Sequence, residues 1–267
     1  MDPGLKHFCD AVPPDIIADV ATWADDVRDV EPGTASQHFI DFPRALGANI
    51  NDPASFCPGG GCVVDAIVTR FRQLTSSTDP VERANALRFL IHFVADVHQP
   101  LHAVTNGDRG GTCLHVRYFR QPSVEDAKGN FRPNLHSIWD GETIRRLMRS
   151  RGLANAQELA SFIAGQDLPA SVAPIVPTSE RVNSWARRSN ALARRVGYGA
   201  LPVNPPLESA SAWALKSCAE NDHVGRRMAD LNERIGASYE RQSIPVIMSQ
   251  LRLAAERLAG VLQAAFP

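Results

Sequence analysis

Long apolar runs and surplus positive charge are both missing from this chain of 267 residues. No stretch reaches the roughly 18 continuous apolar residues that a membrane-spanning helix needs, so no such helix is expected. The first residues, MDPGLKHFCDAVPPD, lack the basic segment and apolar core of a signal peptide, which predicts a cytoplasmic protein or a chain without its natural start. The formal net charge is −1, so tight sequence-reading binding to DNA is not expected.

Strand patterns are scarce as well, and helical periodicity dominates the sequence. The best strand candidate is LHVRYF (114–119), which allows at most one short β-hairpin. Hydrophobic residues make up 44% of the chain and charged residues 21%, as in ordinary soluble proteins, and no shift in composition marks a second domain. We therefore predict an all-α, mainly helical fold in a single domain spanning residues 1–267. Apolar residues recur at helical spacing in 13–30, 62–76, 79–99, 134–150, 156–165, 181–198 and 244–266.

The five cysteines do not form a metal-binding pattern by their spacing. Cys57 and Cys62 bracket the short segment PGGG, which could close a small disulfide and would then indicate an oxidising compartment. From the spacing alone, it is equally consistent that Cys57 and Cys62 are two free thiols. The other three cysteines are Cys9, Cys113 and Cys218.

The segment HFVADVHQPLH (92–102) carries an unusual density of histidine inside an apolar helix. His92 and Asp96 are four residues apart and therefore share one helical face. A buried imidazole and carboxylate need partners, because an unpaired buried polar group costs roughly 2–7 kcal/mol. A divalent metal ion would serve both side chains. Pro100 ends the helix and places His102 just beyond it. His98 lies about 240° around the helix from His92, so we expect it to support the metal ligands or to cap the helix.

The same four-residue spacing recurs in NLHSIWD, at His136 and Asp140. A single pair of this kind is usually a surface pair or a hydrogen-bonded core histidine, but two pairs favour a metal centre. Upstream, WADDVR offers Asp25, and QHFIDFP offers His38 and Asp41. Mixed histidine and aspartate ligands are typical of catalytic zinc sites that keep one position open.

Together these segments resemble the S1/P1 family of zinc-dependent nucleases. The motifs that carry the resemblance are TWADDVR, CPGGGCVVDAI, HFVADVHQPLH, DRGG (108–111) and NLHSIWD, and the match runs from about residue 10 to the C-terminus. The resemblance implies a secreted or periplasmic, monomeric enzyme, not bound to membranes, that cuts single-stranded DNA and RNA. It also implies action as a 3′-nucleotidase, 5′-phosphorylated products, and a nearly all-α fold with three zinc ions.

The resemblance further implies roles for particular residues. Asp25, His38, His92 and Asp96 would hold one zinc ion, and His102, His136 and Asp140 a second, with Asp96 bridging to a third. Arg28 and Asp25 would be catalytic, with Arg28 steadying the phosphate. Phe39 would stack on a base and Asp41 would hydrogen-bond to it, near a Cys57–Cys62 disulfide.

Two departures from the family pattern bear on activity. The chain begins at Met1 with no tryptophan before Trp23, whereas the third zinc of the family uses an N-terminal tryptophan and a nearby histidine. His7 lies too few residues before Asp25 to leave room for the first helix and loop. We therefore expect two retained zinc sites in a truncated or mis-started chain. Thr112 stands where the family motif has asparagine, so its part in substrate binding is altered.

The sequence thus predicts a zinc-dependent phosphodiesterase that hydrolyses single-stranded nucleic acids. One alternative is a zinc phospholipase C-like phosphodiesterase, which Phe39, Asp41 and the Cys57–Cys62 segment disfavour because they would serve a base. The other is a catalytically impaired, nucleotide-binding relative that lacks the N-terminal metal ligands. Lipid hydrolysis without strand cleavage would favour the first alternative, and metal and nucleotide binding without cleavage the second.

Overall fold

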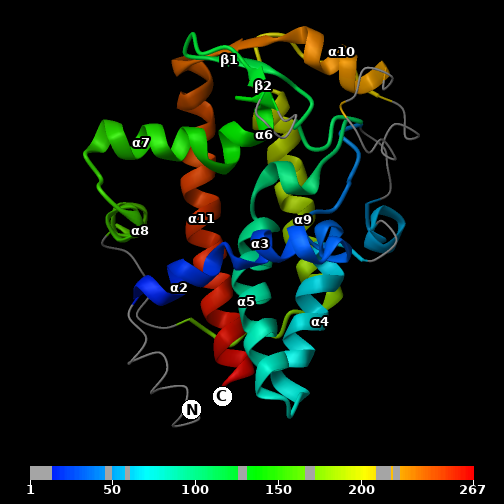
Figure 1. The fold of residues 1–267 in the computed structure, drawn as a ribbon, viewed down its shortest axis with the longest axis vertical. Helices are drawn as coiled ribbons and strands as arrows, with labels where there is room; N and C mark the ends of the chain where they lie inside the picture. Colours follow the sequence, from blue (N-terminus) through cyan, green and yellow to red (C-terminus); the bar gives the residue numbers. More distant parts are fainter. Residues whose placement is uncertain are drawn as a thin grey trace.

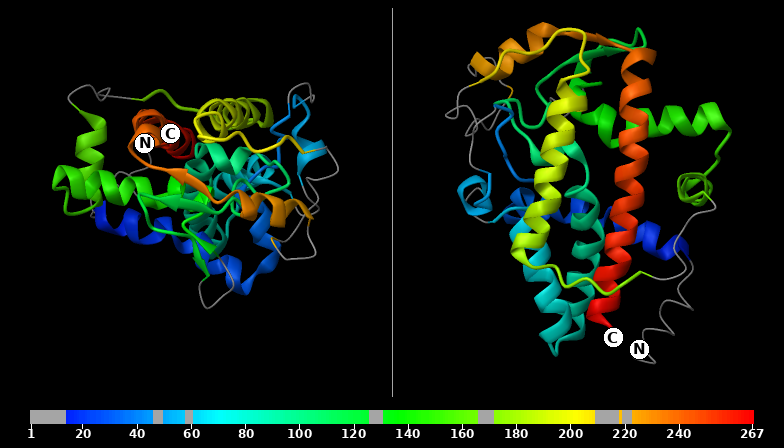
Figure 2. Two further views of the ribbon diagram at one scale, coloured as in Figure 1. Left: turned by 90° about the horizontal axis from the view of Figure 1, so that it is seen from above. Right: turned by 180° about the vertical axis from the view of Figure 1, so that it is seen from behind.

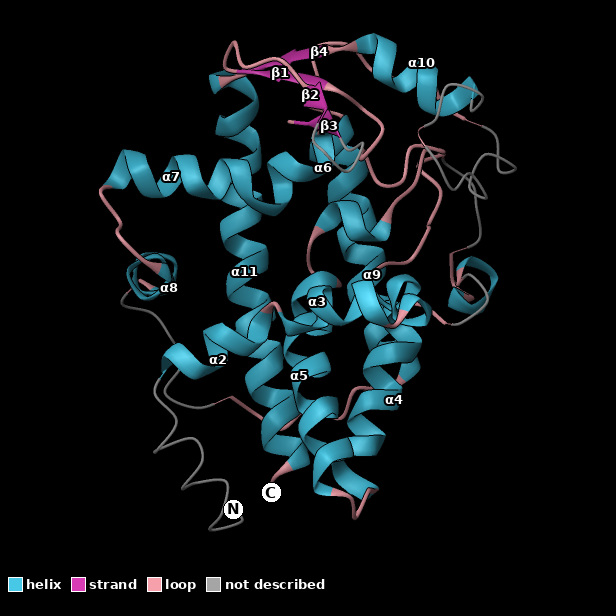
Figure 3. Ribbon diagram, viewed as in Figure 1, coloured by secondary structure: helices cyan, strands magenta, loops and turns pink. Residues whose placement is uncertain are grey.

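The computed structural model describes residues 14–45, 50–57, 61–125, 131–165, 172–208, 218 and 223–267. These residues are mainly helical, which confirms the all-α prediction (Figures 1 and 3). None of the helices in these ranges is long and apolar enough to cross a membrane. The α-helices are α2 (Pro14–Ala21), α3 (Trp23–Val30), α4 (Val63–Ser76), α5 (Pro80–Asp96), α6 (Leu135–Ser137), α7 (Thr143–Arg151), α8 (Ala156–Ala164), α9 (Ser179–Leu192), α10 (His223–Leu231) and α11 (Ala237–Ala265).

Short helical turns link several of these helices. Three are 3₁₀ turns: η1 (Pro32–His38), η2 (Pro53–Phe56) and η3 (Pro100–Ala103). Two are π-helical: η4 (Ile138–Glu142), which joins α6 to α7, and η5 (Ala193–Tyr198), which continues α9. Single π turns are often found at functional sites, and η4 contains Asp140.

Helices α4, α5, α9 and α11 run along the long axis of the molecule, and α5 contacts both α4 and α11 (Figures 1 and 2). Helix α5 begins where the sequence predicts, because the Asp79 carboxylate accepts a hydrogen bond from the Val81 backbone N–H at 2.8 Å and Pro80 occupies the first turn. Helices α2 and α3 cross the outside of α5 and contact it. The central position of α5 explains its nearly all-round apolar sequence.

Two groups of buried apolar side chains flank the histidine-rich segment. The α4–α5 core includes Val63, Ile67, Phe89, Phe93 and Trp185. The second core draws on η3, α6, η4, η5 and α11, and it includes Leu101, Leu135, Trp139, Tyr198 and Tyr239. Burying a large apolar side chain stabilises a fold by about 1.5–3 kcal/mol, so both cores hold their helices firmly.

The strands differ from the predicted single hairpin. β1 (Val116–Tyr118) lies within the predicted segment 114–119, but it pairs in parallel with β4 (Glu233–Ile235), which is distant in sequence. The antiparallel pair is β2 (Val124–Glu125) with β3 (Phe131–Arg132). Strands β2 and β3 have two residues each, too few for an alternating pattern, and no local pattern could show that β1 pairs with the distant β4.

The segment 13–30, which the periodicity predicts as one helix, is broken at Thr22 into α2 and α3. The Asp25 N–H donates to the Thr22 carbonyl at 3.0 Å, instead of to the Ala21 carbonyl as a continuous α-helix requires. The Ala21 carbonyl is thereby available to the imidazole of His92, whose Nδ1 lies 2.6 Å away. The break in the helix therefore allows a backbone carbonyl to orient His92.

Candidate metal centre

The structure brings the seven side chains that the sequence predicts as metal ligands into one cluster. Two groups of three stand out, and in each group the ligand atoms all lie within 4.8 Å of one another. The first triad comprises Asp25 of α3, His38 of η1 and His92 of α5. The second triad comprises His102 of η3, His136 of α6 and Asp140 of η4.

Asp96, in the last turn of α5, joins the two triads. Its Oδ2 lies 3.0 Å from His38 Nδ1 and 3.1 Å from His92 Nε2, both in the first triad. Its Oδ1 lies 3.2 Å from His102 Nδ1, in the second triad. One buried carboxylate therefore faces both groups.

The second triad continues the chain of polar contacts. His102 Nε2 lies 3.4 Å from Asp140 Oδ1, and His136 Nε2 lies 3.2 Å from Asp140 Oδ2. The rings of His102 and His136 are stacked, with centroids 4.9 Å apart. Gln99 also donates to Asp140 Oδ1, at 2.6 Å, so three neighbouring side chains fix this carboxylate.

Backbone carbonyls orient three of the imidazoles. His92 Nδ1 donates to the Ala21 carbonyl at 2.6 Å, His102 Nδ1 to the His38 carbonyl at 3.0 Å, and His136 Nδ1 to the Gly110 carbonyl at 2.9 Å. Each bond fixes the ring and leaves Nε2 facing the cluster. Metal-binding histidines almost always donate their other nitrogen in this way.

The donor atoms of the cluster fit a divalent metal ion. His102 Nε2 is buried, and although Asp140 Oδ1 lies 3.4 Å away, this nitrogen makes no hydrogen bond with the described residues, which without a ligand costs about 1–3 kcal/mol. A metal ion would supply that partner. The remaining donors are imidazoles and carboxylates, the mixed set that suits zinc in a site with an open position.

The charges in the cluster are coupled. Burial alone would lower the pKa of His92, but the hydrogen bond and charge of Asp96 raise it to about 9. Burial alone would raise the pKa of Asp96, yet contacts with His102, His38 and His92 hold it well below its usual range. The pKa of Asp140 is likewise held low, by His136 and His102, against the effect of burial. Both carboxylates are therefore ionised at neutral pH, as metal ligation requires.

A cavity of about 690 Å³ opens beside the cluster. Arg28 lies in its wall, with a guanidinium nitrogen 3.4 Å from Asp25 Oδ1. Phe39 and Thr112, two residues predicted to bind substrate, also line it. Asp41 is not among the described lining residues. Burial, and next the charge of Asp108, raise the pKa of Asp41 to about 7.

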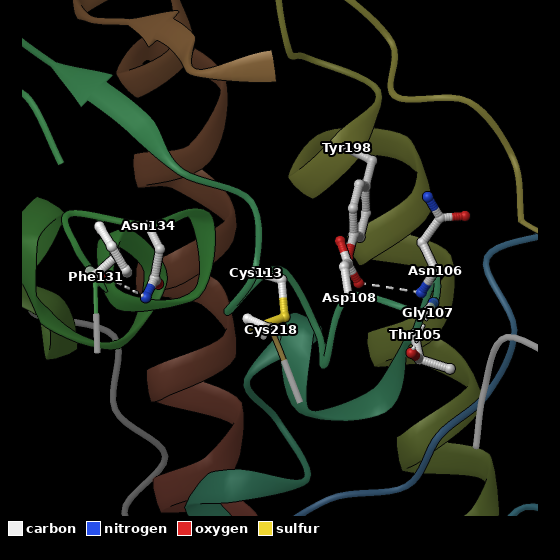
Figure 4. The surroundings of a disulfide bond; sticks show 9 residues. All are labelled: Thr105, Asn106, Gly107, Asp108, Cys113, Phe131, Asn134, Tyr198 and Cys218. Atoms are coloured by element: carbon white, nitrogen blue, oxygen red, sulfur yellow. Dashed lines mark hydrogen bonds between the residues drawn. A yellow bond between two sulfur atoms is a disulfide. The ribbon is translucent and has the colours of Figure 1, made fainter. Parts of the chain in front are cut away.

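The loop that follows η3 orients His136 of the second triad. The sequence motif DRGG (108–111) marks part of this loop but does not show its contacts. Asp108 is fully buried, and the Tyr198 hydroxyl lies 2.9 Å from each of its carboxylate oxygens (Figure 4). Asp108 Oδ1 also accepts from the Asn106 N–H at 3.1 Å, which closes the loop. The loop then presents the Gly110 carbonyl to His136. Asp108 and Tyr198 are supporting residues that the sequence analysis did not assign.

Two disulfides are present among the described cysteines. Cys57 and Cys62, the pair that spacing left open, are joined, with Cα atoms 4.8 Å apart. Cys113 and Cys218 are also joined, with Cα atoms 5.3 Å apart, which the sequence analysis missed (Figure 4). The separation of 105 residues gave no local signal for this pairing. His7, which was considered as a ligand, lies outside the described residues.

Comparison with known proteins identifies a family that this chain resembles along nearly its whole length. A sequence model of the S1/P1 Nuclease family matches residues 5–267. Nuclease P1 from Penicillium citrinum is 33% identical over 202 residues, which cover 74% of this chain and 64% of that protein. Nuclease PA3 from a Penicillium species is 28% identical, with the same two coverages. Nuclease S1 from Aspergillus oryzae is 26% identical over 256 residues, 92% of this chain and 78% of that protein. The chain thus spans just under two thirds of the length of two of these relatives.

Proposed function

The chain belongs to the S1/P1 nuclease family, and from this premise we propose that it is a zinc-dependent phosphodiesterase of single-stranded DNA and RNA. It would act as an endonuclease and 3′-nucleotidase and leave 5′-phosphorylated products. The observation that carries the proposal is the pair of triads bridged by Asp96 at the wall of a cavity that also holds Arg28 and Phe39.

The chain's own residues would hold the metal ions. Bound zinc supplies Lewis-acid stabilisation of a phosphate and makes water more acidic. The first ion would be held by the first triad with Asp96, and the second ion by the second triad. Because the carbonyls of Ala21, His38 and Gly110 fix three imidazoles, the ligands are arranged before the metal binds, which favours tight binding.

Arg28 would bind the scissile phosphate. Its guanidinium is held at the cavity wall by Asp25, which is itself a member of the first triad. A guanidinium can donate two parallel hydrogen bonds to phosphate oxygens and stabilises the negative charge that develops on them. Arg28 therefore orients the phosphate relative to the first triad.

Phe39 would favour single strands over duplexes. Its side chain lies in the cavity wall, where an unpaired base can stack on it. Bases inside a duplex are stacked on one another and are not accessible to such a residue. The formal net charge of −1 agrees with this preference, because the chain has no basic surplus for gripping duplex DNA.

We also propose a secreted or periplasmic location and a monomeric state. Two disulfides support an oxidising compartment, since disulfides are rare in cytosolic proteins. Non-reducing and reducing mass spectra of the protein from its natural source would test the disulfides. Light scattering of the purified protein would test the oligomeric state.

The proposed activity is tested with labelled oligonucleotides in single-stranded and duplex form, with zinc and after chelation by EDTA. We expect cleavage of the single strand, loss of activity in EDTA, recovery on adding zinc, and 5′-phosphate ends on the products. His136→Ala should abolish cleavage, whereas His115→Ala, which removes a histidine outside the cluster, should not. Cleavage that persists in EDTA or in His136→Ala would contradict the proposal. So would hydrolysis of phosphatidylcholine vesicles without strand cleavage.

A further inference from the structure

A second cavity, of about 530 Å³, adjoins the first on the side of the second triad. We call it the arginine cavity. Because the two cavities share part of their walls, a ligand that fills one of them borders the other. The shared lining residues are Arg28, Thr112, Arg132, His136 and Asp140.

The arginine cavity differs from the first cavity in chemistry. Its described lining residues are all polar, charged or glycine, and three are arginines, Arg28 of α3, Arg132 of β3 and Arg145 of α7. The acidic lining residues are Asp29 and Asp140. The first cavity is also lined by three arginines, Arg28, Arg109 and Arg132, but its walls add apolar side chains that the arginine cavity lacks. Among these apolar side chains are Phe39, Trp139, Ile144, Ile247 and Leu251. Apolar side chains suit a base, whereas a wall of polar and arginine side chains suits a phosphate.

Two of the three arginines already pair with carboxylates, Arg28 with Asp25 and Arg145 with Glu142. No ion pair joins Arg132 to a carboxylate among the described residues, so its charge remains available to an anion. The cavity lies at the edge of the second triad, and a nucleic acid strand places a negative phosphate on either side of the one being cut. A positively charged groove that follows the backbone is the usual way to bind such a strand.

The local structure fixes Arg145 at the wall of this cavity. Its guanidinium donates to Glu142 Oε1 at 2.7 Å, which holds the side chain against the π turn. It also lies directly over Gly141, where an added Cβ would come within 2.7 Å of Arg145 Nη1. Glycine at this position leaves room for the arginine.

We propose that the arginine cavity is a subsite for the phosphodiester adjacent to the scissile one, with Arg132 and Arg145 as its anion-binding residues. The inference rests on the proposed function and extends it. It makes a strand with at least two phosphates the preferred substrate class, ahead of a lone nucleotide or a dinucleotide.

Three small substrates test the subsite. The first is the thymidine dinucleotide TpT, which has one phosphodiester, and the second is the trinucleotide TpTpT, which has two. The third is TpTpT with one linkage replaced by a neutral methylphosphonate, prepared in both positions. Wild-type protein should cleave TpTpT with a kcat/KM about tenfold above that for TpT, the effect of one charged hydrogen-bonded contact. Both methylphosphonate trimers should fall to the level of TpT, because the linkage that remains cleavable then has no charged neighbour in the subsite. The products of the first cut in unmodified TpTpT, thymidine with pTpT or TpT with pT, identify the side of the subsite.

The test variant is the double substitution Arg132→Gln with Arg145→Gln. Its ratio of kcat/KM for TpTpT over TpT should fall from about ten to near one. The matched control is Arg149→Gln, an exposed arginine one turn further along α7 and outside both cavities. The control should keep the wild-type ratio. A double variant that keeps the ratio, or that loses activity on both substrates equally, would overturn the subsite.

Failure of the proposed function would look different. If wild-type protein cleaves neither substrate, the subsite is decided by binding of a fluorescein-labelled oligothymidylate, measured by anisotropy over a range of salt concentrations. The double variant should then bind more weakly and lose about 0.7 from the slope of log affinity against log salt for each lost contact. Equal affinity and equal slope in the double variant and the wild type would overturn the subsite in that case.

Discussion

The two triads use the same kinds of ligand but are held in place by different means. In the first triad, His38 and His92 lie on η1 and α5, which pack on the α4–α5 core, and His38 is almost fully buried. In the second triad, His102, His136 and Asp140 lie on short turns, and Asp140 is exposed at its surface. Backbone carbonyls orient imidazoles in both triads, but the first triad is also held by packing on long helices, whereas the second lies on short turns.

This difference shows where each triad is vulnerable. The first triad depends on a regular helix whose apolar residues are buried on nearly all sides. The second triad depends on the loop around Asp108 and on the Gly110 carbonyl that it presents to His136. A substitution in that loop should therefore damage the second triad and leave the first intact. Asp96, which faces both triads, and the His38 carbonyl, which accepts from His102, are the contacts through which a change in one triad can reach the other.

Replacing the shared carboxylate should have the largest effect. In Asp96→Asn the first triad loses a negatively charged ligand and the second loses the negative charge beside His102, so zinc content should fall below one ion per chain. kcat/KM on single strands should fall by on the order of 10³-fold, because metal ions supply several kcal/mol of transition-state stabilisation. Elemental analysis and steady-state kinetics measure the two effects.

The control for this variant is Asp25→Asn, which changes a ligand of the first triad alone. Its zinc content should fall by about one ion, with the second triad still occupied. Equal zinc loss in both variants would mean that the two triads do not bind zinc independently, which would contradict the difference drawn between them.

A side chain at Gly110 should damage the second triad selectively. The residue has φ of +61°, and an added Cβ would lie 2.3 Å from the Leu101 carbonyl oxygen and 3.3 Å from His136 Nδ1. Gly110→Ala should lower the free energy of unfolding by about 2–4 kcal/mol, from backbone strain and the clash together. It should also weaken zinc binding at the second triad. Chemical denaturation and zinc titration against a competing chelator measure these effects.

Gly152 provides a matched control. It has φ of +67°, but an added Cβ would have nothing within 4 Å. Gly152→Ala should cost only the strain of the left-handed conformation, about 1–2 kcal/mol, and should leave zinc binding unchanged. If Gly110→Ala behaves like Gly152→Ala, the Gly110 carbonyl does not hold His136 in the way proposed.

Removing the Tyr198 hydroxyl should have a smaller effect on the same triad. Tyr198→Phe deprives the buried Asp108 carboxylate of its side-chain donor, which should cost about 1–3 kcal/mol of stability. The loop should then hold His136 less firmly, and zinc affinity at the second triad should fall roughly tenfold, as for other residues that support ligands. Tyr118→Phe removes a similar buried contact between a tyrosine and a carboxylate, to Glu240, away from the cluster. It should lower stability alone, and equal zinc loss in both variants would point to a general loss of structure.

The contrast between the triads also explains how far the sequence could predict this site. Helical spacing places His92 and Asp96 on one face, so their proximity follows from the sequence. The family motifs supplied the remaining ligands, but not the contacts that orient them. The break at Thr22 goes with a hydrogen bond between Ala21 and His92, which are far apart in the chain. The contact between Asp108 and Tyr198 and the Cys113–Cys218 disulfide also join distant residues. No local pattern records such contacts, because they depend on tertiary packing.

The protonation of Asp41 should produce the smallest effect, and it bears on the comparison because one of its causes, after burial, is the charge of Asp108 in the loop of the second triad. Burial and the charge of Asp108 raise its pKa from 3.8 to about 7, so the folded protein binds a proton there that the unfolded chain has released. Stability should therefore decrease as pH rises from about 4 to 7 and then level off. Asp41→Asn removes this dependence and should stabilise the protein at pH 8 by about 1–3 kcal/mol, a gain that disappears near pH 4. Urea denaturation of both proteins between pH 4 and 8 measures the difference, and a gain that is constant with pH would show that the Asp41 carboxyl does not titrate in this range.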